Sequence, residues 1–318
     1  MGYIIGLDVG GTKCAVTLAQ TLKNERPLIL DKIQFPTPHR DPQGTLERFF
    51  HELNALINQN KLKYSDIDGI GVSCGGPLDS KNGVVLSPPN LPAWDEIHVC
   101  SFFKEKTGIN TRLQNDANAC AVAEWKWGAG KGLQNVVFLT FGTGLGSGLI
   151  LDGKLYCGAR DNAGEIGHVR LEKDGPVGYG KIGSCEGFCS GGGLKQLGIK
   201  AMLEAGESSA LYKSAEGDPE KISAKLIASL AEEGDELCLD IYRRCGENLG
   251  RTLAILCDIL DPQAIILGGI YMRADHLLKE SLLKVLETEA LLPCPVLKAG
   301  LGENVGDYAA LSIAEGDF

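Results

Sequence analysis

A carboxylate between two amides stands out in the chain, in the stretch Asn115-Asp116-Ala117-Asn118-Ala119. Asp116 could take a proton from a bound hydroxyl group, while Asn115 and Asn118 would hold that hydroxyl or the backbone around it. A second interpretation is that Asp116 or Asn115 is only the N-cap of a helix expected over residues 117–127. The five residues alone do not separate these interpretations, so the neighbouring motifs decide.

A glycine-rich turn lies near the start of the chain, in Gly10-Gly11-Thr12-Lys13. It joins strands expected over residues 3–9 and 14–19, and the incoming strand carries Asp8. The glycines let backbone N–H groups approach a phosphate and Thr12 adds a hydroxyl, while Asp8 suits Mg²⁺ bound through water. An ordinary hairpin turn is the alternative interpretation, and it leaves Asp8 unexplained.

A second turn of the same kind is Gly142-Thr143-Gly144-Leu145-Gly146-Ser147-Gly148. Strands are expected on both sides of it, over residues 135–141 and 149–151. Its glycines alternate and a strand follows, whereas the dinucleotide-binding fingerprint opens a helix, so an NAD-dependent dehydrogenase is disfavoured. We expect the two turns to face each other across a cleft and to grip the phosphates of one nucleotide.

Three further loops offer backbone or an amide to a ligand. Gly75-Gly76-Pro77 follows a strand expected over residues 68–73 and makes a tight turn. Residues 87–94 form a stiff, proline-rich loop that presents Asn90, although such loops also serve as plain surface connections. Gly268-Gly269 ends another strand and offers bare backbone to a flat ring.

Two acids and a histidine complete the polar candidates. Glu165 and His168 lie three residues apart in a glycine-rich stretch. A lone histidine is more often structural, but Glu165 beside it favours a binding site. Glu186 lies just before a helix expected from about residue 187, a favourable place for an acid whether or not it binds a ligand.

The remaining segments are expected to pack these loops in place. At 318 residues the chain is long enough for two domains and a sizeable core. Further helices are expected over residues 41–60, 97–107, 219–231, 235–260, 275–287 and 307–314, and further strands over residues 28–33, 111–113, 264–267 and 295–298.

The charge balance limits the partners. Formal net charge is −10, from 31 Lys and Arg against 41 Asp and Glu, and no basic cluster stands out. Nucleic acid and anionic membranes are therefore disfavoured as partners, and nucleotide phosphates must be bound locally by backbone N–H groups and metal.

The cysteines and the start of the chain indicate the compartment. The 11 cysteines are odd in number, and Cys14, Cys120 and Cys257 lie in apolar runs, which favours buried thiols over disulfides. No signal peptide is expected, and no apolar run reaches the ~18 residues of a membrane span. We expect a soluble, cytoplasmic protein.

Six motifs taken together resemble the ROK family of ATP-dependent sugar kinases and sugar-responsive repressors. They are Asp8-x-Gly10-Gly11-Thr12, Gly75-Gly76-Pro77, Pro89-Asn90-Leu91-Pro92-x-Trp94, Asn115-Asp116-Ala117-Asn118, Gly142-Thr143-Gly144-x-Gly146 and Gly164-Glu165-Ile166-Gly167-His168. Each is weak alone, but the six follow the family's order along nearly the whole chain. The resemblance implies the ribonuclease H-like, actin/hexokinase-type α/β fold, duplicated in two domains with a cleft between them. It assigns residues 1–116 plus 303–318 to a small N-terminal domain and residues 117–302 to a large C-terminal domain.

Carried over position by position, the resemblance makes Asp116 the base that accepts the proton of the attacking sugar hydroxyl. The implied sugar-binding residues are Asn115, Glu165, His168 and Glu186, completed by Asn90 and the backbone of Gly75 and Gly76. ATP with Mg²⁺ would be held by Asp8, Gly10, Gly11, Thr12, Lys13, Thr143 and Gly144, with Gly268 and Gly269 near the adenosine. The implied partners are a small sugar and ATP, and the family's habit is a homodimer.

The chain departs from the family at a zinc site. The family's pattern combines the histidine with a Cys-x-Cys-Gly-x-x-Gly-Cys-x-Glu run, and here the three cysteine positions are Val177, Tyr179 and Ser184. Cys185 and Cys189 are displaced from that spacing, so we expect no structural zinc. Something else, such as Tyr179 packing in the loop, must then hold His168 and Glu186 in place, or the sugar site is weakened.

The leading hypothesis is a hexose kinase that moves the γ-phosphoryl group of ATP to a sugar hydroxyl. Glucose, phosphorylated at its 6-position, is the default substrate, while N-acetylmannosamine, N-acetylglucosamine, allose and fructose stay open. A repressor is disfavoured because no helix-turn-helix segment precedes the hairpin at residue 3. A non-catalytic sugar-binding or regulatory relative is the third possibility.

Overall fold

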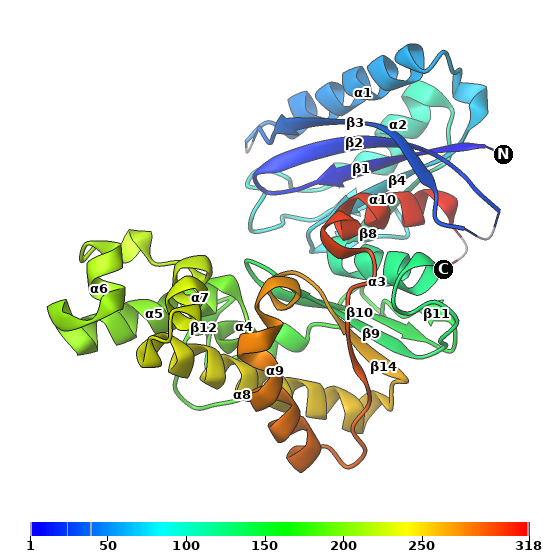
Figure 1. Ribbon diagram of the computed structural model, residues 1–318. Coiled ribbons are helices and arrows are strands. Elements are labelled where there is room, and N and C mark those ends of the chain that lie inside the picture. Colours follow the sequence, from blue (N-terminus) through cyan, green and yellow to red (C-terminus); the bar gives the residue numbers. More distant parts are fainter. Residues whose placement is uncertain (1, 24, 39, 317) are drawn as a thin grey trace. The chain divides into compact units, whose positions relative to one another are not determined.

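The computed structural model describes residues 2–23, 25–38, 40–316 and 318. The chain forms two compact units (Figure 1). Unit 1 comprises Met1–Phe138, Gly148–Ala163 and Ala299–Phe318, and unit 2 comprises Leu139–Ser147 and Gly164–Lys298. Residues 117–138, 148–163 and 299–302 group here with the N-terminal part, whereas the resemblance assigned them to the large domain. The division into two functional domains stays a prediction.

Unit 1 is built on a five-stranded sheet with the order β3-β2-β1-β4-β8. The strands are β1 (Tyr3–Val9), β2 (Lys13–Gln20), β3 (Leu28–Pro36), β4 (Ile67–Cys74) and β8 (Thr111–Asn115). β2 pairs antiparallel with both β1 and β3, while β4 pairs parallel with both β1 and β8. The strands expected in this part of the chain are confirmed.

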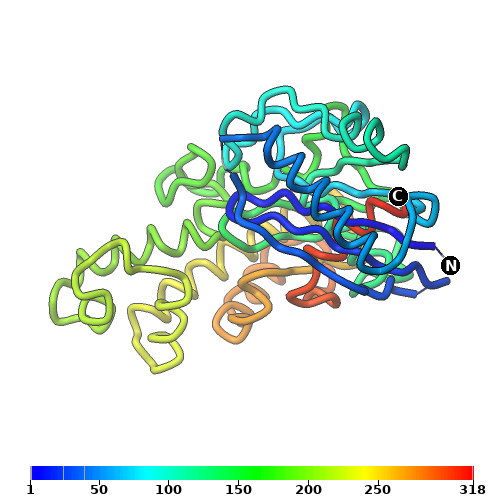
Figure 2. The backbone as a smooth tube through the Cα atoms, turned by 90° about the horizontal axis from the view of Figure 1, so that it is seen from above, coloured from blue at the N-terminus to red at the C-terminus, as the bar shows by residue number. Residues whose placement is uncertain are grey.

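Helices cover both faces of this sheet (Figure 1). α1 (Pro42–Gln59) and α2 (Val99–Thr107) lie on one face, and α10 (Val305–Glu315) lies on the other. Seen from above, the coil of α1 lies over the strands (Figure 2). The last helix of the chain therefore packs against its first strands.

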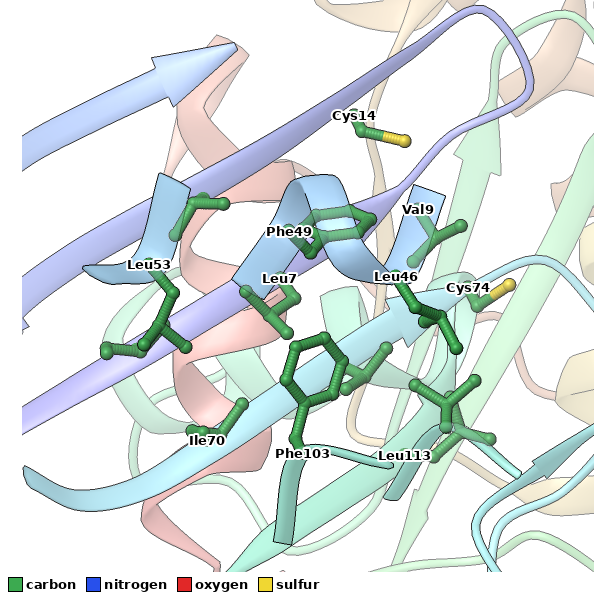
Figure 3. Packing of buried hydrophobic residues seen from close by; sticks show 14 of the residues in the cluster. Leu7, Val9, Cys14, Leu46, Phe49, Leu53, Ile70, Cys74, Phe103 and Leu113 are labelled. Atoms are coloured by element: carbon green, nitrogen blue, oxygen red, sulfur yellow. The ribbon is translucent and has the colours of Figure 1, made fainter. Parts of the chain in front are cut away.

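Alternate residues of β1 serve the two faces, because successive side chains of a strand point to opposite sides. Leu7 lies in the same buried cluster as Phe49 of α1 and Phe103 of α2 (Figure 3). Ile4 instead packs in a cluster with Leu311 of α10. Asp8, four residues after Ile4, therefore lies on the α10 face.

A small sheet with the order β5-β6-β7 follows the Gly75-Gly76-Pro77 turn. Its strands are β5 (Leu78–Asp79), β6 (Val84–Val85) and β7 (Ile97–His98). These short strands were not expected, and β7 takes the first two residues of the helix predicted over residues 97–107.

A second five-stranded sheet has the order β11-β10-β9-β14-β15. Its strands are β9 (Val136–Phe141), β10 (Leu145–Leu151), β11 (Lys154–Leu155), β14 (Ala264–Leu267) and β15 (Val296–Lys298). The expected start of β10 at residue 149 is wrong, because the strand begins at Leu145 and leaves only residues 142–144 as the turn. Gly148 has a packing role instead: a Cβ there would lie 2.6 Å from the Cβ of Ala121.

Unit 2 is mostly helical. Its helices are α4 (Cys185–Phe188), α5 (Gly191–Ala205), α6 (Ala210–Ala215), α7 (Ala224–Glu232), α8 (Glu236–Leu260) and α9 (Ile270–Glu289). α8 and α9 approach closely at Gly250, where a Cβ would lie 2.5 Å from the carbonyl oxygen of Leu282. α9 begins ahead of the helix expected from residue 275, and a kink at Ala274 (φ −120°, ψ 21°) separates its first turn from the rest.

None of the helices in the described ranges combines the length and apolar character needed to cross a membrane. The three cysteines expected to be buried, Cys14, Cys120 and Cys257, all are. All 11 cysteines are free thiols, as the odd count and the apolar surroundings indicated.

Candidate functional site

The junction between β8 and α3 (Asp116–Trp127) positions the central carboxylate of unit 1. Asn115 is the last residue of β8 and the N-cap of α3, and its Oδ1 accepts from the N–H groups of Ala117 (3.0 Å) and Asn118 (3.4 Å). The capping interpretation is therefore confirmed for Asn115. It leaves Asp116 in the first turn of the helix, where the positive end of the helix dipole favours an acid.

Asp116 combines access with a perturbed environment. Its side chain retains solvent-exposed area, and its Oδ1 accepts from the N–H of Ala117 at 2.8 Å. Surrounding protein nevertheless desolvates the carboxylate and raises the pKa of Asp116 above its ordinary value. A reachable carboxyl group with a raised pKa has the properties of a general base.

Asn118 does not serve this site directly. Its side chain is buried, and its Nδ2 donates to Oε1 of Gln114 at 3.1 Å. Of the two roles expected for Asn118, holding a bound hydroxyl or the backbone around it, this contact supports the second. It stabilises the end of β8, because Oε1 of Gln114 also accepts from the N–H of Asn115 at 2.8 Å.

Asp8 is the second acid of unit 1. Burial, followed by the charges of Asp116 and Asp307, raises the pKa of Asp8 to about 7, against the opposing effect of Lys32 and Lys13. Lys32 is itself paired with Asp307 of α10, with 2.5 Å between Nζ and Oδ1. Asp8 lies on the face of the sheet that α10 covers, and this explains why Asp307 of α10 raises the pKa of Asp8.

Amide side chains lie against the glycine turns of unit 1. A Cβ at Gly11 would lie 3.1 Å from Nδ2 of Asn90, and one at Gly75 would lie 3.4 Å from Oδ1 of the same residue. A Cβ at Gly76 would lie 3.2 Å from Nδ2 of Asn115. A side chain at Gly11 or Gly76 would therefore require the neighbouring amide to shift by a few tenths of an ångström, whereas the distance at Gly75 is close to an ordinary contact.

The first glycine turn has a support that the sequence analysis missed. Thr37 donates from Oγ1 to the carbonyl of Gly10 (2.7 Å), and its N–H donates to the carbonyl of Thr12 (3.0 Å). Thr12 and Lys13 remain exposed at the tip of the hairpin. A threonine between Pro36 and Pro38 was the signal, since two prolines stiffen the residue between them.

The second glycine turn meets two other glycine-rich segments within unit 2. The N–H groups of Gly191 and Gly192, at the start of α5, donate to the carbonyls of Gly142 (2.8 Å) and Thr143 (3.2 Å). Gly269 has a φ of +63°, and a Cβ there would lie 2.0 Å from the carbonyl oxygen of Phe141. Residues 142–144 and 268–269, predicted separately, are thus brought together.

Ser190-Gly191-Gly192-Gly193 was not singled out from the sequence. Ser190 is the N-cap of α5 and its Oγ accepts from the N–H of Gly193 at 2.9 Å. A serine followed by three glycines at a helix start was the signal, because glycines admit another backbone at close range. Here the backbone admitted is the turn at residues 142–144.

Glu186 is tied to the same turn. Its Oε2 accepts from the N–H of Leu145 at 3.0 Å, and a Cβ at Gly144 would lie 2.6 Å from that oxygen. Glu186 is half-buried in the first turn of α4, which Ser184 caps through a hydrogen bond from the N–H of Gly187 (3.1 Å). The acid therefore links α4 to the glycine turn.

Glu165 and His168 are exposed residues of a short loop in unit 2. Glu165 is the N-cap of a 3₁₀ turn, Ile166–His168. The His168 ring packs edge-on against Tyr179, with 6.1 Å between ring centroids, and Nζ of Lys181 donates to its carbonyl at 2.7 Å. The expectation that Tyr179 packs against this loop is confirmed.

The family's three cysteine positions have taken other roles. Val177 and Tyr179 belong to a hairpin of β12 (Val177–Gly178) and β13 (Lys181–Ile182), and Ser184 caps α4. Across the described part of the chain, no three His, Cys, Asp or Glu side chains gather as metal ligands would. The absence of structural zinc stays a prediction.

Part of the candidate set thus lies in one cluster in each unit. Unit 1 brings together Asp8, Gly11, Gly75, Gly76, Asn90, Asn115 and Asp116. Unit 2 brings together Gly142, Thr143, Gly144, Glu186, Gly191, Gly192 and Gly269.

Known proteins resemble the chain over its full length. A glucokinase of Thermotoga maritima is 30% identical over 316 residues, which cover 98% of this chain and 96% of that protein. The crystal structure of a ROK family glucokinase from Streptomyces griseus, in complex with glucose and AMPPNP, aligns with a TM-score of 0.78 and 29% identity over 99% of both chains. A xylose repressor of Caldicellulosiruptor bescii is 28% identical over 92% of this chain and 72% of its own length.

The family model described as "ROK family" matches residues 4–316. Together with the solved relatives it confirms the α/β fold of the actin and hexokinase type. The six motifs, the two glycine turns and the match along nearly the whole sequence agree, and the chain belongs to the ROK family.

Proposed function

We propose that the chain is an ATP-dependent sugar kinase that phosphorylates a hexose, with glucose and its 6-hydroxyl as the first candidate. The relatives named glucokinase support this assignment, since one is 30% identical over nearly the whole chain. The observation that carries it is Asp116, a solvent-reachable carboxyl group with a raised pKa at the start of a helix, within charge range of Asp8.

Asp116 acts as the general base in this proposal. It accepts the proton of the sugar hydroxyl while the hydroxyl oxygen attacks the γ-phosphorus of ATP. A new P–O bond to the sugar forms as the bond between the γ-phosphorus and the bridging oxygen breaks, and ADP leaves with that oxygen. The proton then passes from Asp116 to solvent.

The remaining residues position the two substrates. We assign sugar binding to the backbone of Gly75 and Gly76 and to the side chains of Asn90, Asn115, Glu165, His168 and Glu186. We assign nucleotide binding to Asp8, Gly10, Gly11, Thr12, Lys13, Thr143, Gly144, Gly268 and Gly269. The close approach of the glycine turns to neighbouring atoms supports a role for bare backbone N–H groups in both sets.

The residues of unit 1 fit a magnesium ion. The charge of the Asp116 carboxylate raises the pKa of Asp8, and a divalent cation would relieve that repulsion. Asp8 would hold Mg²⁺, because Mg²⁺ takes one or two protein carboxylates and otherwise keeps water and phosphate oxygens. When bound, the ion neutralises the charge that develops on the phosphates.

A hexose fits the polar character of the assigned sugar-binding residues. Carboxylates and amides can each accept from or donate to paired hydroxyls, and a wrong epimer leaves them unpaired. N-acetylmannosamine, N-acetylglucosamine, allose and fructose remain the alternatives. We place the reaction in the cytoplasm, which the 11 free thiols support.

A coupled ADP-release assay over a panel of hexoses and N-acylhexosamines tests the proposal. Sugar-dependent ADP release, strongest with one member of the panel, is the expected result. The alternative is that the chain is a regulatory protein, an interpretation supported by its similarity to a relative named xylose repressor. It predicts sugar binding in calorimetry with no ADP release, and that outcome would overturn the kinase assignment.

A further inference from the structure

The hairpin of β12 and β13 in unit 2 needs support from outside itself. Each strand has two residues, and the connecting Tyr179 and Gly180 both have positive φ values of 43° and 73°, as a type I′ turn requires. Tyr179 and Val177 are 65% and 43% exposed, so little apolar burial holds the hairpin down. An isolated two-stranded hairpin of this size is marginal in water.

Gln196 of α5 supplies such support through one side chain, beside a longer hydrogen bond from Oγ of Ser184 to the carbonyl of Gly178 (3.4 Å). Its Oε1 accepts from the N–H of Val177 at 2.9 Å, and its Nε2 donates to the carbonyl of Val177 at 2.8 Å. Both backbone groups of Val177 are thus paired by a single amide, in the way a neighbouring strand would pair them. Nε2 also reaches the carbonyl of Gly192 at 3.3 Å, which ties the amide to its own helix.

Only a primary amide can make this pair of contacts. The side chain must offer an acceptor and a donor side by side, and among the standard side chains of this length glutamine alone does so. A glutamate at position 196 would place an oxygen against the Val177 carbonyl, and an alanine would leave both backbone groups to water.

The hairpin in turn contacts two of the assigned sugar-binding residues. A Cβ at Gly178 would lie 2.7 Å from the Cβ of Glu186 and 2.4 Å from the N–H nitrogen of Gly187, so the hairpin backbone lies directly on Glu186. The packing of Tyr179 on His168 and the hydrogen bond from Lys181 to the His168 carbonyl provide the second contact.

We propose that Gln196 is a positioning residue for sugar binding, because its amide fixes the hairpin that holds Glu186 and His168. The hydrogen bonds of the Gln196 side chain go to Val177 and Gly192, so in this proposal it acts on Glu186 and His168 through the hairpin. The proposal rests on the proposed function, since it assumes that Glu186 and His168 bind the sugar.

Gln196→Ala and the isosteric Gln196→Glu test the role, with Lys195→Ala as the matched control. Lys195 is the neighbouring residue of α5, and its ion pair is with Glu220, away from the hairpin (2.8 Å). Amide hydrogen exchange of the sugar-free protein should quicken over residues 176–183 in both Gln196 variants and stay unchanged in the control. Unchanged exchange over these residues would show that the Gln196 amide does not hold the hairpin, whatever the protein's activity.

Steady-state kinetics then test the consequence for function. The KM for the sugar should rise about tenfold in both Gln196 variants, as the loss of a hydrogen-bonded support implies. The KM for ATP and kcat should change less than threefold, and the thermal midpoint should match that of Lys195→Ala. A fall in kcat with no rise in the sugar KM would overturn the positioning role.

A wild-type protein that neither phosphorylates nor binds any sugar of the panel would overturn the proposed function and this role with it. Faster exchange with an unchanged sugar KM, in an active wild-type enzyme, would overturn the positioning role alone.

Discussion

Asp8 and Asp116 lie within charge range of one another in unit 1, although more than a hundred residues separate them in sequence. Burial, and after it the charge of Asp116, raises the pKa of Asp8 from 3.8 to about 7. The folded protein therefore keeps a proton on Asp8 through a pH range in which an unfolded chain has released it.

This difference predicts how stability depends on pH. Between about pH 4 and pH 7 the folded state binds more protons than the unfolded state, so the free energy of unfolding falls as the pH rises through that window. Asp8→Asn removes the ionisable group. In metal-free buffer at pH 8 the variant should be more stable than wild type by about 4 kcal/mol, and the difference should disappear below about pH 4.

Urea denaturation at several pH values measures this effect. Asp68→Asn is the matched control, because Asp68 is an exposed aspartate on the neighbouring strand β4. Parallel pH profiles for wild type and Asp8→Asn would mean that Asp8 carries an ordinary charge in the folded protein.

Replacement of Asp116 tests the general base. Asp116→Ala removes the group that accepts the hydroxyl proton, so kcat should fall by about a thousandfold, within the range typical of a general base. The sugar should still bind, because the assigned contacts of Asn90, Asn115 and Glu186 remain. Calorimetric titration with the sugar provides that control, and an undiminished turnover rate would remove Asp116 from the role.

Replacement of Glu124 should affect stability and not the chemistry of the site. Its buried carboxylate accepts three backbone N–H groups, those of Ala129 (2.8 Å) and Gly300 (2.9 Å) on Oε2 and that of Leu301 (2.8 Å) on Oε1. Glu124→Ala leaves all three donors without this partner, so the free energy of unfolding should fall by about 3 kcal/mol.

The exposed Glu105 of α2 is the control for that change, since Glu105→Ala should alter stability by less than about 0.5 kcal/mol. Both values come from denaturant unfolding of unit 1, followed by Trp fluorescence. Equal stability of the two variants would contradict the view that Glu124 anchors the segment at Gly300 and Leu301 to α3.

Local pattern predicted the elements well where one segment decides its own structure. The hairpin of β1 and β2, the long helix α8 and the helix after Asn115 follow from apolar spacing and capping residues. The two interpretations of Asn115-Asp116 turned out to be compatible, because Asn115 caps the helix and leaves the carboxylate of Asp116 for chemistry.

Contacts between segments that are distant in the sequence could not be predicted from the local sequence pattern. The effect of Asp307 on Asp8 depends on which face of β1 the last helix covers. The support of residues 142–144 by Gly191 and Gly192 depends on where α5 begins, and the close approach of Gly148 to α3 depends on how β10 packs against that helix. Each requires the tertiary fold, which the spacing of one segment does not contain.

Metal analysis of the purified protein should show no stoichiometric zinc. Val177, Tyr179 and Ser184 offer no thiolate at the family's ligand positions, and the displaced Cys185 is buried, which raises the pKa of its thiol to about 11. A thiol that stays protonated is a poor zinc ligand, and one histidine cannot close a tetrahedral site. Activity should therefore survive dialysis against a zinc chelator once Mg²⁺ is restored. Zinc at one ion per chain, or a loss of activity that zinc alone restores, would show that residues 177–189 bind metal in another arrangement.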